Sequence, residues 1–156
     1  MGKRILLALT LLIAATASAT IPLAASAEGM SPLVIGARFS LETGMGTFSA
    51  CCALSDSGTA ALEITSFDER GNEGVFEATN TFTGADGSFT IAIRGTTGPL
   101  VIDGAENPRH IARGRWHVIS GTGDYVGLKG HGALTAMSDY VAGTLTAVDD
   151  GVAKLP

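Results

Sequence analysis

The sequence predicts an all-β protein, built as a small closed antiparallel barrel of about eight strands, with a β-sandwich as the alternative. Short runs of β-branched, aromatic and small residues alternate with clusters of Gly, Asp, Asn and Ser that are typical of turns. No stretch after residue 27 has a sustained helical period. The chain holds 21 glycines, and glycine in strands favours the tight curvature of a small barrel over a flat sheet.

The first 27 residues have the pattern of a cleavable secretory signal peptide. Lys3 and Arg4 precede an apolar run at 5–15, and Ala-Ser-Ala at 25–27 forms the expected cleavage site, with 17–19 as a competing site. The run of about eleven residues is too short to span a bilayer as a helix, although an uncleaved anchor is the alternative. We therefore expect a secreted protein whose residues 28–156 form one domain.

The acidic charge of the chain bears on its partners. The net charge of the whole chain is −5, and loss of Lys3 and Arg4 leaves 8 basic against 15 acidic side chains, a net charge of −7. An acidic surface argues against nucleic acid and anionic membranes as partners. We expect no contact with nucleic acid, no membrane contact after cleavage, and no cofactor.

Eight strands are predicted from the β-prone runs, and turn sequences separate them. The clusters at 55–58, 68–72 and 85–87 carry the Asp, Ser and Gly chemistry of hairpin turns. The segment 97–109 holds two prolines and is predicted as a long loop with a short edge strand at 100–102. The eight predicted strands are 34–41, 47–54, 59–67, 75–82, 88–94, 113–119, 132–137 and 142–148.

Alternation of side chains along each predicted strand assigns an interior and an outer face. Glu63, Phe67, Glu77, Arg94 and His117 fall on the outer face. The predicted interior positions are Leu62, Ile64, Ser66, Phe76, Ala78, Asn80, Phe82, Phe89, Ile91, Ile93, Trp116 and Val118.

The most distinctive stretch is 114–132, GRWHVISGTGDYVGLKGHG. It resembles the signature of a family of small bacterial secreted barrels, is similar to the DUF3224 domain, and more distantly resembles the allene oxide cyclase and dirigent barrels. Residues 46–48, 55–59 and 83–91 resemble the hairpins of that family. The resemblance implies an eight-stranded antiparallel barrel of the allene oxide cyclase-like type, a class in which apolar substrates bind inside the barrel and are guided through cyclisation or coupling.

The glycines of this stretch also have a physical interpretation. Gly121 and Gly123 permit backbone angles that let the chain turn sharply out of the strand of Trp116. Residues 124–128 are predicted to form one helical or 3₁₀ turn that places Tyr125 and Leu128 over the end of the barrel as a plug. A phosphate-binding loop is disfavoured, because no Lys-Ser/Thr follows and no βαβ unit surrounds the glycines.

The two cysteines, Cys51 and Cys52, are adjacent in a predicted strand. Because strand neighbours point to opposite faces, an ordinary bridge between them is geometrically poor. We therefore expect one buried and one exposed thiol, with a strained vicinal disulfide or a bridge between two chains as alternatives. The pair lacks the spacing of a metal site.

The sequence assigns no catalytic residues. No serine lies in a nucleophile elbow, and His110, His117 and His131 form no strand pair that would hold a metal, so no metal site is expected. The candidate ligand-binding residues are Trp116, Tyr125, Arg94, Glu77 and His117, although each also has a structural explanation as a core, plug or outer-face residue.

These observations favour an exported barrel that binds a small apolar molecule or serves as a stable extracellular module. One alternative is a cyclase or isomerase acting on a small apolar substrate inside the barrel. Another is a surface or assembly protein, a homo-oligomer joined through Cys51 or Cys52. A barrel of about eight strands is either filled by its own side chains or holds one small ligand, so a cavity separates the first two functions from the third.

Overall fold

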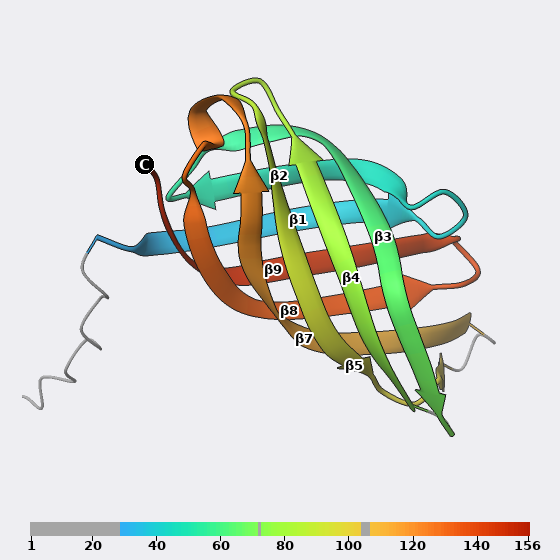
Figure 1. Ribbon diagram of the computed structural model, residues 1–156. Helices are drawn as coiled ribbons and strands as arrows, with labels where there is room; N and C mark the ends of the chain where they lie inside the picture. The colour runs from blue at the N-terminus through green and yellow to red at the C-terminus, as the bar shows by residue number, and fades with distance from the viewer. Residues whose placement is uncertain (1–28, 72, 104–106) are drawn as a thin grey trace, which may run out of the picture.

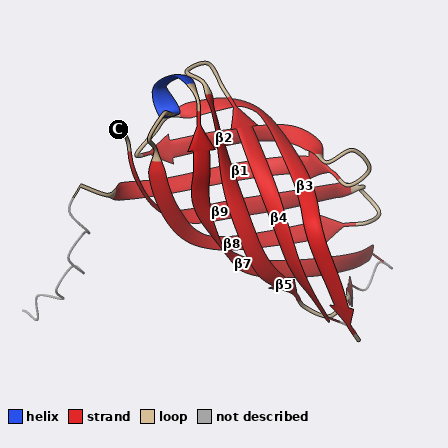
Figure 2. Cartoon of the chain, viewed as in Figure 1, coloured by secondary structure: helices blue, strands red, loops and turns tan. Residues whose placement is uncertain are grey.

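The computed structural model describes residues 29–71, 73–103 and 107–156, so the predicted signal peptide lies outside the described residues. Within them the chain forms antiparallel strands and one 3₁₀ turn, η1 (Gly123–Tyr125) (Figures 1 and 2). The strands are β1 (Ser31–Ser40), β2 (Met45–Cys52), β3 (Asp56–Arg70), β4 (Glu73–Thr83), β5 (Ser88–Thr97), β6 (Val101–Asp103), β7 (Asn107–Gly121), β8 (Lys129–Asp139) and β9 (Thr144–Lys154).

Eight of these strands close into a barrel, which confirms the predicted fold class. Each strand pairs with its neighbour in the order β5-β4-β3-β2-β1-β9-β8-β7, and pairing between β5 and β7 completes the ring. The ribbon shows the strands tilting around a common interior (Figure 1). The short β6 lies outside this ring and pairs only with the first three residues of β7, 107–109.

Each predicted strand is present, and most are longer than predicted. The largest difference is β7, which begins at Asn107, whereas the sequence predicts a loop over 97–109. Pro108 is tolerated there because it lies at the start of the strand, before the pairing with β5 begins at Ala112. The final strand, β9, runs to Lys154 and so includes two aspartates beyond the predicted end at Val148.

Aromatic side chains fill one end of the barrel interior. The ring centroids of Phe48 and Phe82 lie 5.1 Å apart, those of Phe82 and Phe89 5.0 Å, and those of Phe89 and Tyr125 5.3 Å. Trp116 is buried as predicted, and its Nε1 donates a hydrogen bond of 3.2 Å to the carbonyl oxygen of Ala133. This end of the barrel is therefore a packed hydrophobic core.

A glycine makes room for the indole of Trp116. A Cβ atom at Gly151 would contact the backbone of His131 and Gly132 and would lie 2.8 Å from Cζ2 of Trp116. Any larger residue would force the strands or the ring to move, since core packing leaves little free space. Gly151 of β9, paired with Gly132 of β8, thus lets a large side chain fit inside a narrow barrel.

Residues 123–128, which we call the plug, cover the aromatic end of the barrel. Tyr125 and Leu128 are both buried, as the sequence predicts, and Figure 2 shows the helical turn above this end. The Tyr125 hydroxyl donates a hydrogen bond of 2.7 Å to Oδ2 of Asp56. That bond lowers the pKa of the Asp56 carboxyl below its usual value, because it stabilises the charged form.

Replacing Tyr125 by phenylalanine is expected to lower the free energy of unfolding by about 1 kcal/mol at pH 7, which is less than a fully buried bond to a charged group contributes, because Asp56 is partly exposed. A depressed carboxyl pKa stabilises the fold above its unfolded value, and this stabilisation is lost as pH falls through the folded pKa. Urea unfolding of the wild type and the variant at about pH 7 and about pH 2.5 measures the loss of stability and its disappearance at low pH. Tyr140→Phe, at the opposite end, is the control; an equal loss for Tyr125→Phe at both pH values would contradict the assignment.

One predicted face is wrong. Alternation places Phe67 on the outside and Ser66 inside, but the pairing of β3 with β4 shifts register between Ile64 and Ser66. This bulge reverses the alternation, so that Phe67 pairs with Phe76 and lines the cavity at the open end, where it stays 54% exposed, while Ser66 is on the outer face.

Candidate functional site

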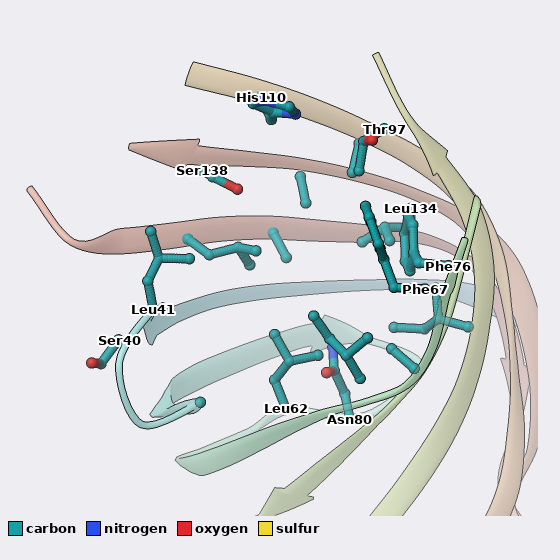
Figure 3. A pocket seen from close by; sticks show the side chains of 18 of the residues that line it. Ser40, Leu41, Leu62, Phe67, Phe76, Asn80, Thr97, His110, Leu134 and Ser138 are labelled. Atoms are coloured by element: carbon teal, nitrogen blue, oxygen red, sulfur yellow. The ribbon is translucent and has the colours of Figure 1, made fainter. Parts of the chain in front are cut away.

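A cavity of about 450 Å³ occupies the end of the barrel opposite the plug. Its wall comes from the ends of β1, β3, β5 and β8 and the starts of β4, β7 and β9, whereas the plug covers the other ends of the strands. Figure 3 shows side chains from these strands converging on the open space. The plug and the cavity therefore give the barrel one closed and one open end.

The cavity exists because small side chains meet at this end. Ala78 of β4, Ala136 of β8 and Ala147 of β9 are buried and line it, whereas phenylalanines fill the plugged end. Most of its wall is apolar, with a few polar groups nearer the turns. The apolar side chains are Leu41, Leu62, Ile64, Phe67, Phe76, Ala78, Ile93, Ala112, Leu134, Ala136, Leu145 and Ala147.

Polar and aromatic groups border the opening of the cavity. His110 at the start of β7 packs edge to face against Tyr140, in the turn after β8, with ring centroids 5.7 Å apart and an interplanar angle of 83°. Figure 3 shows Ser40, Ser138 and His110 away from the deeper apolar group of Leu134 and Phe76. Leu41, Ile64 and Phe67 also line the cavity and are exposed at this end, so an entering molecule would meet both hydrogen-bonding groups and apolar side chains.

Asn80 is the buried polar residue that lines the cavity. Its side chain is 1% exposed and extends from β4 beside Leu62 (Figure 3). Within the described residues its Oδ1 has no hydrogen-bond partner. An unpaired buried acceptor lowers the stability of the fold by about 1–3 kcal/mol. A ligand whose hydrogen-bond donor reaches Asn80 Oδ1 in the cavity would remove this cost.

Asp149 is the second buried polar side chain. It is fully buried on β9, where its neighbours across the sheet are Ile35 and Leu134, and neither carboxyl oxygen has a partner among the described residues. Burial raises the pKa of Asp149 to about 7, because the charged form loses its hydration. Leu134 lines the cavity but Asp149 does not. The carboxyl of Asp149 is therefore buried without contacting the cavity.

The five candidates from the sequence lie away from the cavity. Trp116 is in the packed core, and Tyr125 belongs to the plug at the opposite end. Arg94 and Glu77 face each other across β4 and β5 on the outer surface, with Nε of the arginine 3.8 Å from Oε1 of the glutamate. His117 is exposed on the outside of β7. None of the five lines the cavity.

Asn80 and Asp149 were not among those candidates, although the sequence around each residue offers a clue to its position. Asn80 lies on a predicted interior face between Ala78 and Phe82, and a polar residue on an apolar strand face is a recognisable anomaly. Asp149 lies just beyond the predicted end of its strand at Val148, so alternation along that strand assigns it no face.

The expectation of one buried thiol is wrong. Cys51 and Cys52 are both exposed, and their Sγ atoms lie 2.7 Å apart. The left-handed backbone of Cys52, with φ of 83°, is the reason, because it breaks the alternation that would place this side chain inside.

In residues 29–71, 73–103 and 107–156, no three His, Cys, Asp or Glu side chains are grouped so that they could hold a metal ion. Over the same ranges no helix is long and apolar enough to cross a membrane. No protein-family model matches the chain, and searches of curated proteins and of solved structures found no match.

Proposed function

We propose that this protein is exported and binds one small apolar molecule that carries a hydrogen-bond donor, in the open end of its barrel. The observation that carries this function is an apolar cavity of about 450 Å³ with one buried, unpaired acceptor, Asn80 Oδ1, in its wall. Ligand sites are commonly concave, apolar and supplied with a few polar groups that fix orientation. Export rests on the signal-peptide pattern of residues 1–27.

The energetics favour a ligand over an empty structural module. Each methylene that leaves water for the cavity contributes about 0.8 kcal/mol. A donor on the ligand would also pair with Asn80, which otherwise loses hydrogen bonding on folding. A purely structural barrel would be more stable with larger side chains at Ala78, Ala136 and Ala147 and with an apolar residue at position 80.

The resemblance of residues 114–132 to secreted barrels of the allene oxide cyclase-like type supports the same function, because apolar molecules bind inside barrels of that type. A cyclase or isomerase is the second candidate, and Asp149 is the observation that favours it. A carboxyl with a pKa of about 7 is suited to proton transfer near neutrality. Binding is preferred because Asp149 does not reach the cavity surface.

The neutral fluorophore N-phenyl-1-naphthylamine, which has one N–H donor, tests the site by direct titration. We expect saturable binding with enhanced fluorescence, and Asn80→Leu is expected to weaken it by roughly tenfold, the equivalent of one hydrogen bond. The same variant is expected to unfold at higher denaturant concentration, since it removes an unpaired buried amide. Thr79→Leu, on the outer face of the same strand, is the matched control.

The N-methylated fluorophore separates donor recognition from simple partitioning. It has the same aromatic body without the N–H group, so its affinity is expected to be equal for the wild type and for Asn80→Leu. Equal affinity of the N–H fluorophore for the two proteins would refute the role of Asn80. Absence of saturable binding by either fluorophore would count against the cavity as a ligand site.

A further inference from the structure

The end of β2 departs from regular strand geometry at Cys52. Phe48 and Ala50 point into the barrel, and alternation would bring Cys52 in after them. Its φ of 83° is instead left-handed, and it is the only non-glycine residue with positive φ among those that the structure describes. The side chain consequently turns out to the surface, and Leu54 takes the next buried position.

This backbone brings two neighbouring thiols together. Strand neighbours ordinarily diverge to opposite faces, which keeps their sulfurs too far apart for a bond. At Cys51 and Cys52 both side chains lie on the exposed side, and the Sγ atoms are 2.7 Å apart. Cysteine is also an unusual choice for a left-handed position, which glycine or asparagine occupies at lower cost.

Pairing with β1 holds the two cysteines in this arrangement. Val34 is the partner of Cys51 and Leu33 the partner of Cys52, and the amide of Ala53 donates a hydrogen bond of 2.7 Å to the carbonyl oxygen of Pro32. The backbone is therefore fixed both at the pair and immediately after it. The chain contains no third cysteine, so each thiol has one intrachain partner.

We propose that Cys51 and Cys52 are the site of an intrachain vicinal disulfide, formed by exchange with an external low-molecular-weight or protein disulfide. One thiol, as its thiolate, attacks a sulfur of the oxidant, forms a mixed disulfide and releases one oxidant thiol. The thiolate of the other cysteine then attacks the protein sulfur of the mixed disulfide and releases the second oxidant thiol. In total two electrons and two protons pass to the oxidant, and one S–S bond forms between the two cysteines.

The position of the two cysteines predicts which part of the barrel a disulfide between them would affect. Cys52 borders a surface cleft together with Tyr125 of the plug and Pro156 at the C-terminus. Residues 53–55 link the pair to Asp56, the acceptor of the Tyr125 hydroxyl. Oxidation therefore acts on the closed end of the barrel and is expected to leave fluorophore binding at the open end unchanged.

Equilibration of the full chain with a reduced and oxidised glutathione buffer tests the site. After acid quenching and alkylation, mass spectrometry is expected to show a monomer lighter by about 2 Da that takes up no alkyl group. Because the fold holds the sulfurs together, the oxidation equilibrium constant is expected to be at least roughly tenfold larger in buffer than in concentrated urea. Peptide mapping should place the bond within residues 51–52.

Single variants supply the control. Cys51→Ser and Cys52→Ser keep one exposed thiol each, and both are expected to remain alkylatable or to carry one glutathione. Three results would overturn the proposal: two alkylated thiols in the oxidised wild-type chain, a disulfide-linked dimer in place of the lighter monomer, or an equal equilibrium constant in urea. The dimer result would instead support joining of two chains through these thiols.

Discussion

Replacing Asp149 by asparagine is expected to raise the free energy of unfolding by about 4 kcal/mol at pH 8, the equivalent of a shift of roughly three pKa units. Asp149 is fully buried, and its carboxyl oxygens have no partner in the described part of the chain. Folding at this pH must therefore remove a charge from water without compensation. Asparagine has nearly the same shape and carries no charge, so the variant avoids this cost.

The pH dependence of the effect has a definite sign. The folded pKa of Asp149, about 7, lies above the ordinary carboxyl value, so the native state binds a proton that the unfolded state releases. Stability of the wild type is thus expected to fall as pH rises from about 4 to about 7 and then to level off. The difference from Asp149→Asn should be near zero at about pH 4 and complete at about pH 8.

Denaturant unfolding of both proteins at a series of pH values measures this difference directly. Asp150→Asn is the matched control, because Asp150 is the next residue on β9 and is exposed. It is expected to change stability little at any pH. A constant difference between Asp149→Asn and the wild type across the range would show that the carboxyl does not change its protonation in the folded state.

Replacing Ala136 by phenylalanine is expected to abolish saturable binding of N-phenyl-1-naphthylamine, with affinity reduced at least roughly a hundredfold by the lost volume. Ala136 is 5% exposed and lines the cavity from β8, so the ring would occupy the space that the fluorophore needs. Stability is expected to hold or to rise, because the ring fills an existing space rather than a packed core.

The neighbouring position provides the control for this substitution. Thr135→Phe adds the same ring to the outer face of the same strand, one residue away, and is expected to leave fluorophore affinity unchanged. Thermal unfolding of both variants separates blocked binding from a damaged fold. Binding by a folded Ala136→Phe protein that equals that of the wild type would place the fluorophore outside the cavity.

Local pattern was sufficient to predict the fold of the described residues. Alternation along β4 and β5 places Phe82, Phe89 and Ile91 inside, and the structure buries all three. The glycines around Tyr125 predicted the turn that forms the plug. Both features follow from period-two alternation and from backbone freedom, which are properties of neighbouring residues.

The cavity could not be predicted in this way, because it depends on residues from different strands. Ala78, Ala136 and Ala147 are unremarkable in their own strands, and only the register of the closed barrel brings them to the same end. The candidate residues drawn from the sequence were large or charged, and such side chains fill the core or face solvent. The cavity is instead left open by small side chains, which a search for large or charged residues does not single out.

Two single-residue departures also lay beyond the pattern. The bulge after Ile64 turns Phe67 toward the cavity, and the left-handed backbone of Cys52 brings two thiols to one surface. Each interrupts the alternation on which the prediction of faces depends.

Native mass spectrometry of the protein isolated from its own source, together with Ala136→Phe isolated in the same way, tests the binding function most directly. A ligand-binding barrel predicts an added mass of a few hundred daltons on the wild type that is absent from Ala136→Phe. The bare polypeptide mass for both proteins, combined with no saturable uptake of the fluorophore, would contradict a ligand site in the open end of the barrel.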